Sequence, residues 1–294
     1  MQKKITLKID KNLCDSKIEN ILKRELGFSS TLISRLKRTV GGIMLNGKMA
    51  KTVTFLKEGD IIELTIPAGK SETVKAIKLP LDILYEDEDV IAVNKPCSMP
   101  THPSGRHKED TLINALGYYF KDTDYSIHVI TRLDKDTSGV VLIAKNPLAA
   151  RILTDSIKNR EIKKEYLAVL NAAPTKKKGT LLLPIKKAED KPLRRIVSPD
   201  GKEAVTSYEV LDAKGGFSLV KLVPVTGRTH QLRVHMSHIG HPIYGDSMYG
   251  APQRDERTYL HCKKLSFIHP VSKEMIFLEA PTPLSFEKFD LDIK

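Results

Sequence analysis

Apolar residues follow two different periods in the first part of the chain. Over residues 15–36 they recur at helical spacing, which predicts two short helices, and Asp15 is placed to cap the first of them. Short apolar runs at 43–45 and 61–66 then follow, with turn residues between them that include the hairpin signal Asn46-Gly47. The pattern therefore predicts two helices and a short sheet.

From residue 81 onward the chain contains many short apolar runs, most of them separated by tight turns. Strand, turn and strand in direct succession indicate antiparallel pairing. Strands are predicted at 81–85, 90–93, 140–144, 166–170, 205–211, 217–223 and 275–278. Helices are predicted after Thr111, from Pro147 and after Thr229. Because the strands outnumber the helices, we expect a mixed, mainly antiparallel α+β domain.

A polar stretch with several lysines, a glycine and a serine joins these two parts. Domain boundaries commonly fall in such stretches, where few contacts cross. We therefore predict a small α+β domain at residues 1–70, a linker at 71–80 and a larger domain at 81–294. The predicted fold class is α+β, with a mainly antiparallel mixed sheet in the larger domain.

Charge is the first property that bears on function. The chain has a net charge of +12 and a pI of about 9.4. Such a surplus favours a polyanionic partner, because lysine and arginine release counterions when they contact phosphates. The surplus is densest in residues 1–75, which contain 15 Lys and Arg against 8 Asp and Glu. A basic but inert surface is the alternative explanation.

The sequence predicts neither a membrane-spanning helix nor structural disulfides. Apolar stretches fall short of the ~20 residues that a spanning helix needs, and the first residues lack the apolar core of a signal peptide. Cys14, Cys97 and Cys262 lie far apart, which argues against a disulfide framework or a cysteine-rich zinc site. We expect a cytoplasmic protein without a membrane partner, and a monomer by default.

The most informative polar segment is residues 131–139, Thr-Arg-Leu-Asp-Lys-Asp-Thr-Ser-Gly. Apolar runs flank it, so two strands would hold the loop rigidly, as is typical of functional loops. Asp134, two residues after Arg132, is the best candidate for chemistry. Asp136 could be a second catalytic carboxylate, but the two carboxyls of glycosidases lie ~5 Å or more apart, usually on separate elements. We expect Asp136 to bond to nearby backbone instead.

Two further segments contain candidate site residues. Tyr166 opens an apolar run, so a strand can anchor its ring and leave its hydroxyl in a cleft. Residues 226–235 read Thr-Gly-Arg-Thr-His-Gln-Leu-Arg-Val-His, and a helix capped by Thr229 would bury Leu232. Arg233 lies beside that buried stripe, where its guanidinium can reach an interior carboxylate.

The same region contains four histidines that could suggest a zinc site: His230, His235, His238 and His241. On a helix they point in different directions, no carboxylate adjoins them, and the His-Glu-x-x-His motif is missing. A Gly-rich motif for cradling phosphates is missing as well. We expect neither a metal nor another cofactor.

Three segments together resemble the signature motifs of RNA pseudouridine synthases. These are Arg-Leu-Asp-x-x-Thr-Ser-Gly at 132–139, Lys164-x-Tyr166 and the ten residues 226–235, which are similar to the family named after ribosomal large-subunit synthase A. Thr131 stands where most members have histidine. The resemblance spans about residues 80–280. It implies that uridine in RNA is detached from its sugar at the base nitrogen and rejoined through carbon 5, without a metal or redox cofactor.

This resemblance also implies roles for single residues. Asp134 would be the catalytic aspartate, as a nucleophile or as a base on the sugar, and Arg233 would pair with it. Tyr166 would stack on the target uracil and is the candidate to accept the proton from carbon 5. The substrate is expected to contact Arg132, Leu232 and Arg228 of the larger domain, and Arg35 and Arg38 of the smaller one.

Residues 10–66 resemble the small RNA-binding module first named from a ribosomal small-subunit protein, the S-four fold. The alternative is a basic helical hairpin that only packs on its neighbour. We expect RNA rather than DNA as the partner, with ribosomal RNA as the substrate and transfer RNA as the alternative. Two other functions stay open: a catalytically inactive RNA-binding or ribosome-assembly factor on the same fold, and a metal-dependent nuclease.

Overall fold

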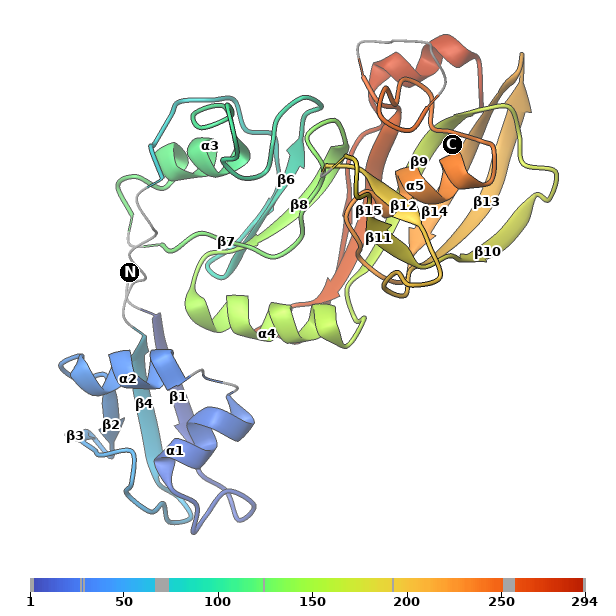
Figure 1. Ribbon diagram of the computed structural model, residues 1–294. Helices are drawn as coiled ribbons and strands as arrows, with labels where there is room; N and C mark the ends of the chain where they lie inside the picture. Colours follow the sequence, from blue (N-terminus) through green and yellow to red (C-terminus); the bar gives the residue numbers. More distant parts are fainter. Residues whose placement is uncertain are drawn as a thin grey trace.

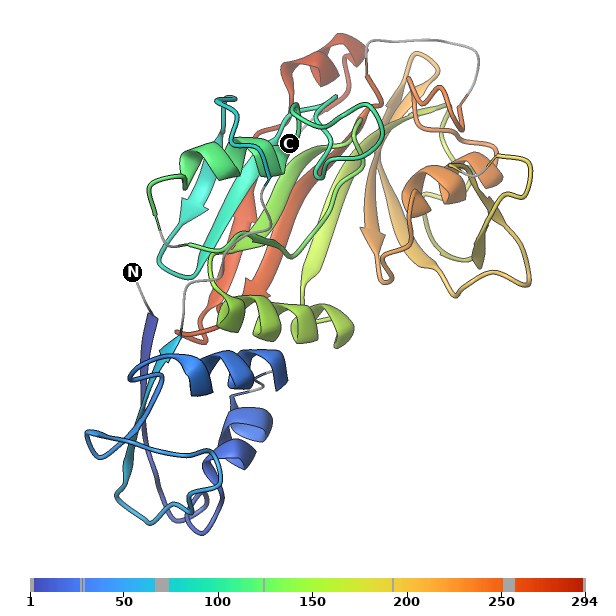
Figure 2. The same cartoon turned by 60° about the vertical axis from the view of Figure 1, so that its left-hand side comes forward.

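The computed structural model describes residues 3–26, 28, 30–66, 74–123, 125–191, 193–250 and 257–292. It contains a small sheet near the N-terminus and a large sheet in the rest of the chain (Figure 1). Helix α4 (Pro147–Lys158) lies on the side of the large sheet that faces the small one, in both views (Figures 1 and 2). Over the described ranges, every helix is too short or too polar to cross a membrane.

The small sheet has the strand order β1-β4-β2-β3. Its strands are β1 (Lys3–Lys8), β2 (Ile43–Leu45), β3 (Lys48–Met49) and β4 (Ile61–Ile66). Its helices are α1 (Ile18–Asn20), which continues as the π-helix η1 (Ile21–Glu25), and α2 (Ser30–Arg38). The predicted strands at 43–45 and 61–66 are confirmed. Strand β1 was not predicted, because Ile5 and Leu7 are too few to establish a period of two.

The predicted helix cap at Asp15 is wrong. Asp15 has a left-handed backbone with φ of 58°, and its amide donates to the carbonyl of Leu56 at 2.8 Å. The helix begins after Lys17, which holds the N-cap position in an extended conformation. A bond to a distant segment therefore moves the start of the helix by two residues.

The large sheet has ten strands, in the order β10-β13-β14-β9-β15-β8-β6-β5, with β16 beside β15 and β7 beside β8. The strands are β5 (Ile83–Glu86), β6 (Val90–Lys95), β7 (His128–Val129), β8 (Ser138–Ala144), β9 (Lys163–Asn171), β10 (Lys178–Leu182), β13 (Val205–Lys214), β14 (Phe217–Pro224), β15 (Leu260–Ile268) and β16 (Met275–Glu279). β15 and β8 pair in parallel, and the other pairings within the described part of this sheet are antiparallel. The predicted mainly antiparallel mixed sheet is confirmed.

Helices and one small hairpin accompany the large sheet. They are α3 (Leu112–Tyr119), α4, α5 (Gln231–His238), the 3-10 helix η2 (Leu284–Phe289), and the hairpin of β11 (Ile185–Lys187) and β12 (Arg195–Val197). The predicted cap at Thr111 is confirmed, since its hydroxyl accepts the amide hydrogen of Asn114. Pro147 begins α4 as predicted, after the capping residue Asn146.

Strand β8 is an interior strand of the large sheet, between β6 and β15, and every one of its residues is buried. The polar loop at 131–137 leads directly into it. The end of that loop is therefore anchored in the hydrophobic core, where small displacements are costly because interiors are closely packed.

Helix α4 contributes to two hydrophobic cores, that of the large sheet and that of the small sheet. Ala149 and Leu153 pack in the core of the large sheet. Leu148 and Ile152 pack instead with the apolar residues of the small sheet and its helices. One helix thus packs against apolar residues of both sheets.

The small sheet ends at Ile66 and the large sheet begins at Ile83. The predicted limits, a domain at 1–70, a linker at 71–80 and a domain at 81–294, remain a prediction. Residues 67–73, on which the first boundary falls, lie outside the described residues.

Candidate active site

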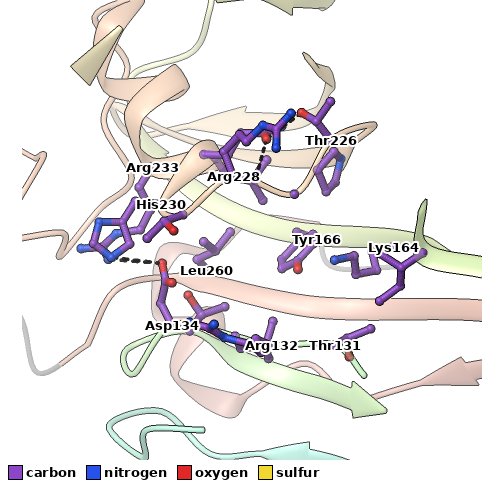
Figure 3. A pocket seen from close by; sticks show the side chains of 18 of the residues that line it. Thr131, Arg132, Asp134, Lys164, Tyr166, Thr226, Arg228, His230, Arg233 and Leu260 are labelled. Carbon is purple, nitrogen blue, oxygen red and sulfur yellow. Dashed lines mark hydrogen bonds and ion pairs between the residues drawn. The ribbon is translucent and has the colours of Figure 1, made fainter. Parts of the chain in front are cut away.

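A cavity of about 310 Å³ opens where the loop at 131–137, strand β9 and the start of α5 meet. It is lined by Ile130, Thr131, Arg132, Leu133, Asp134, Thr137, Ile157, Lys164, Tyr166, Pro224, Thr226, Gly227, Arg228, Thr229, His230, Gln231, Leu232, Arg233 and Leu260. Asp134, His230 and Arg233 face one another at one end, and Tyr166 and Lys164 lie farther along (Figure 3). Three segments that are far apart in the sequence therefore meet in one cavity.

Hydrogen bonds from neighbouring segments hold the loop before Asp134. The hydroxyl of Thr131, which is 2% exposed, accepts the amide hydrogen of Leu142 on β8 at 2.9 Å. The hydroxyl of Thr101 donates to the carbonyl of Leu133 at 2.9 Å. Thr131 thus ties the loop to a buried strand. It stands where most members of the family that this sequence resembles have histidine.

A buried ammonium group holds the other side of the same loop. Lys95 is 0% exposed, and its Nζ donates to the carbonyls of Lys135 (3.1 Å), Met99 (2.7 Å) and Pro96 (2.8 Å). Burial lowers the pKa of Lys95 to about 8. An ammonium has three N–H donors, so in its charged form each of these carbonyls has a partner.

Tyr166 lies on β9 between two neighbouring strands, opposite Leu222 on β14 and Cys262 on β15. It is 6% exposed. Burial is the main reason that its pKa lies well above the usual value. The phenol is therefore protonated at neutral pH, which suits a ring that stacks and a hydroxyl that donates, and disfavours a phenolate that acts as a base.

The start of α5 differs from the prediction. The N-cap is His230, which has a left-handed backbone with φ of 57°, so the predicted cap at Thr229 is wrong. The amide oxygen of Gln231 instead accepts hydrogens from the Thr226 hydroxyl (2.8 Å) and the Arg228 amide (3.0 Å). A buried glutamine side chain, rather than a threonine, thus organises the turn before the helix.

Arg233 lies between two carboxylates. Its Nη1 reaches Oδ2 of Asp134 at 3.4 Å, whereas its Nε and Nη2 donate to the two oxygens of Asp246 at 2.7 and 2.8 Å. The side chain of Asp134 is 28% exposed and that of Asp246 is 0% exposed. Sequence reasoning did not select Asp246, although Tyr244-Gly245-Asp246 is a weak echo of the family pattern.

His230 is the third group beside Asp134. Its Nε2 lies 3.9 Å from Oδ2 of Asp134, and its Nδ1 lies 2.9 Å from the hydroxyl of Tyr249. Burial lowers the pKa of His230, and the charge of Arg233 lowers it further, against the opposing effect of Asp134. The imidazole is therefore mainly neutral at pH 7.

The structure places six of the eight predicted site residues around the cavity: Asp134, Tyr166, Arg233, Arg132, Leu232 and Arg228. The other two, Arg35 and Arg38, lie on α2 beside the small sheet. Arg38 is exposed, while Arg35 is half-buried. The charge of Arg35 also lowers the pKa of His128 on β7, after the larger effect of burial. Arg35 thus lies on the side of the large sheet, whereas Arg38 faces solvent.

The donor sets offer poor metal sites. Both ring nitrogens of His235 are engaged, by the Thr206 hydroxyl and the Leu183 carbonyl at 2.9 Å each. Among the described residues, one cluster has the composition of a metal site: Asp87, Asp89 and His269. There, Nδ1 of His269 accepts two backbone amide hydrogens, so Nε2 carries the proton and faces Asp87 instead of offering a lone pair.

Comparison with known proteins agrees with this geometry. The family profile described as RNA pseudouridylate synthase matches residues 89–238. The chain is 40% identical to a Bacillus subtilis protein described as the uncharacterized RNA pseudouridine synthase YjbO, over 90% of this chain and 95% of that protein. It is 35% identical to the ribosomal large subunit pseudouridine synthase D of Haemophilus influenzae, over 78% of this chain and 75% of that protein.

A solved structure supports the same conclusion. The human RNA pseudouridylate synthase domain containing 1 matches with a TM-score of 0.60 and 29% identity, covering 73% of this chain and 87% of that chain. The profile spans about half of the sequence, and the curated relatives align along most of it. The chain therefore belongs to the RNA pseudouridylate synthase family and is an isomerase that acts on RNA.

Proposed function

We propose that the protein converts uridines of ribosomal RNA into pseudouridines, with Asp134 as the catalytic carboxylate. The observation that carries the assignment is the position of Asp134, partly exposed in the cavity and 3.4 Å from the buried guanidinium of Arg233. A fixed cation at this distance attracts a carboxylate, and both candidate steps use the negative charge of its oxygens.

The target uridine has to leave its stack to reach this cavity, because atoms inside a helix are inaccessible to an enclosed carboxylate. Asp134 then either attacks the anomeric carbon, which breaks the bond to the base nitrogen, or removes a proton from the sugar as that bond breaks. Carbon 5 of the turned uracil next bonds to the same anomeric carbon, which releases Asp134 from the sugar or returns the proton that Asp134 took. Tyr166 stacks on the freed uracil. Its hydroxyl is protonated at neutral pH, so another group takes the proton from carbon 5 or first takes the proton of this hydroxyl.

The remaining predicted residues suit contacts with the RNA backbone. Arg132 and Arg228 are exposed at the cavity, and exposed arginines contact phosphates with two donors at once. The small N-terminal domain binds RNA through Arg38, and Arg35 contacts the RNA beside the larger domain. The enzyme acts as a monomer in the cytoplasm, where ribosomal RNA is found.

Replacement of the proposed carboxylate tests the assignment. Asp134→Asn should abolish pseudouridine formation, followed as tritium release from RNA that is labelled at carbon 5 of uridine, while the Kd for RNA stays within a few-fold. Asp136→Asn is the matched control, since it changes the same residue type in the same loop but does not line the cavity. Turnover by Asp134→Asn would remove this residue from its role.

The substrate class rests on relatives that are described as ribosomal large subunit pseudouridine synthases. Pseudouridines should be mapped in ribosomal and transfer RNA from a strain that lacks the gene. Loss of one or more ribosomal positions is expected. Loss confined to transfer RNA would contradict the ribosomal assignment and leave the enzyme activity intact.

A catalytically inactive RNA-binding or ribosome-assembly factor is the second candidate on the same fold. Both candidates predict RNA binding, so binding alone does not separate them. Growth of the deletion strain should be restored by the unchanged chain, and the modification only by a chain with Asp134. If Asp134→Ala restored ribosome assembly fully, the binding role would be the one that the cell requires.

A further inference from the structure

Arg233 divides its donors unequally between two carboxylates, Asp246 and Asp134. Figure 3 shows Arg233 beside Asp134. Asp246 receives two short, parallel bonds from Nε and Nη2, which is the strong geometry of an arginine–carboxylate pair. Asp134 receives one longer contact from Nη1 to its Oδ2. Among the described residues, no hydrogen bond reaches the other oxygen of Asp134. The carboxylate in the cavity is thus the weaker partner of the shared cation.

Asp246 is itself held firmly. Its Oδ1 also accepts the amide hydrogens of Met248 (3.1 Å) and Tyr249 (3.2 Å), and its own carbonyl accepts the amide hydrogen of Gly250. These bonds belong to the turn after α5, and they leave the Asp246 side chain 0% exposed. A carboxylate that is fixed by its own turn and excluded from water is a rigid reference point for the guanidinium.

Tyr249 completes this support. Its ring lies 5.1 Å from the guanidinium of Arg233, within cation–π range. Its hydroxyl accepts the amide hydrogen of Arg195 at 2.7 Å and bonds to Nδ1 of His230 at 2.9 Å. One short segment after α5 therefore supports both groups that approach Asp134, namely Arg233 and His230.

The division has a chemical consequence. A guanidinium without a second partner would form two bonds with Asp134, and both oxygens of that carboxylate would then be occupied. Because Nε and Nη2 are bonded to Asp246, Arg233 can offer Asp134 only Nη1. Asp134 is still attracted by the positive charge of Arg233, and a substrate can approach at least one of its oxygens. The arrangement stabilises the charge of the carboxylate without covering it.

We propose that Asp246 is a positioning residue that holds Arg233 by two of its nitrogens, so that Arg233 can support Asp134 without closing over it. This inference rests on the proposed role of Asp134. It assigns Asp246 no contact with the RNA, because its side chain is buried behind Arg233. Its replacement should therefore change turnover and leave substrate binding unchanged.

The test compares Asp246→Asn with the unchanged chain. An asparagine keeps the size of the side chain but offers one acceptor oxygen in place of two, so Arg233 is released on one side. We expect kcat to fall about 100-fold, the effect that a displacement of ~1 Å has in a catalytic site. KM and the Kd for RNA should stay within twofold. Asp246→Glu, which keeps both acceptors, should recover part of the loss.

Two measurements separate positioning from simple loss of structure. Asp89→Asn is the matched control, since Asp89 is also a buried loop aspartate, bonded to Asn146, but lies away from the cavity. It should lower the melting temperature and leave kcat unchanged. In an Arg233→Lys background, Asp246→Asn should add little, because a lysine cannot form the two-nitrogen bond.

Several outcomes would overturn the inference. They are an unchanged kcat in Asp246→Asn, a loss in kcat that matches the unfolded fraction of that variant, or a double variant whose loss in kcat equals the product of the losses of Asp246→Asn and Arg233→Lys. If Asp246→Asn does not fold, kcat is measured for Asp246→Glu, whose longer side chain should shift the guanidinium of Arg233 and lower kcat in part. An unchanged kcat in Asp246→Glu would then show that Asp246 is needed only for folding. Absence of turnover in the unchanged chain on every RNA would instead remove the proposed function.

Discussion

Two loops present an aspartate to the same guanidinium, and the two aspartates differ in their surroundings. Asp134 precedes β8 with a side chain that is 28% exposed, whereas Asp246 follows α5 with a side chain that is 0% exposed. The buried aspartate has two short bonds to Arg233, and the exposed one has a single contact at 3.4 Å. Both residues are aspartates, so residue type alone does not show which of them contacts the substrate. Burial and partner count separate Asp134, the carboxylate that we propose to react, from Asp246, the one that we propose to position Arg233.

The two loops are also held in different ways. The loop of Asp134 is tied to other segments, through Thr131, Thr101 and the ammonium of Lys95. The loop of Asp246 is held mainly by its own turn. We infer that distant contacts preorganise the reacting group, while local ones hold the supporting group. Four changes can test this difference.

The largest effect is expected from Arg233→Gln, which removes the cation that both loops share. Asp246 would become a buried charge without its partner, and such changes cost about 3–5 kcal/mol. The free energy of unfolding, measured by urea denaturation, should fall by that amount. Arg228→Gln, at an exposed arginine of the same cavity, should stay within about 0.5 kcal/mol. Equal stabilities of the two variants would contradict the dependence of Asp246 on Arg233.

Gly139→Ala should weaken the loop of Asp134 at its junction with β15. Gly139 has φ of +110°, and an added Cβ would lie 2.2 Å from the backbone oxygen of Cys262. Strain and overlap together should lower the free energy of unfolding by roughly 2–4 kcal/mol. Gly240→Ala is the control, since it has φ of +83° and open space around the added atom. A loss that is the same in both variants would show that the close approach has no effect.

Thr131→Val should have a smaller effect on the same loop. Valine keeps the shape but removes the acceptor for the buried amide of Leu142, and an unpaired buried amide costs about 1–3 kcal/mol. Thermal unfolding and turnover should both decline, while Thr131→Ser should retain most of each. If valine and serine gave the same stability, the hydroxyl would not hold the loop.

The smallest effect concerns pH. Burial lowers the pKa of Lys95 to about 8, from an ordinary value of 10.5. Between these pH values the unfolded chain binds more protons than the folded one, so the contribution of Lys95 to the free energy of unfolding rises with pH. The neutral amine, however, has two hydrogens for three carbonyls, which loosens the loop. Turnover should therefore fall a few-fold as pH rises through 8, although stability does not.

A variant tests this assignment. Lys95→Met has no group that titrates in this range, so its turnover should be lower at pH 7 and should lack the decline near pH 8. The melting temperature of both proteins, followed over the same range, separates activity from unfolding. The same alkaline decline in Lys95→Met would assign the pH dependence to another group.

Local features of the fold were well predicted from the sequence. The cap at Thr111, the start of α4 at Pro147 and the strands at 43–45 and 61–66 depend on neighbouring residues, and the structure confirms them. Strand β15 was missed, because the two lysines at 263–264 break its apolar run. It is a strand because β8 and β9 pair with it on both sides.

Predictions at the start of α5 failed for a similar reason. Thr229 is a residue type that commonly caps helices. The side-chain oxygen of Gln231, however, accepts hydrogens from the Thr226 hydroxyl and the Arg228 amide, and its side-chain NH2 donates to the carbonyl of Val205 on β13. His230, directly before Gln231, has a left-handed backbone. A cap preference of ~1 kcal/mol is easily outweighed by such contacts.

The sequence by itself determined which residues are available for chemistry, because Asp134, Tyr166 and Arg233 stand in motifs whose spacing can be seen along the chain. The tertiary structure alone decided which carboxylate Arg233 holds and which one it leaves accessible. Its partner Asp246 is thirteen residues farther along the chain, beyond the end of α5. Burial and bond count depend on how distant segments pack, and a linear pattern contains neither quantity.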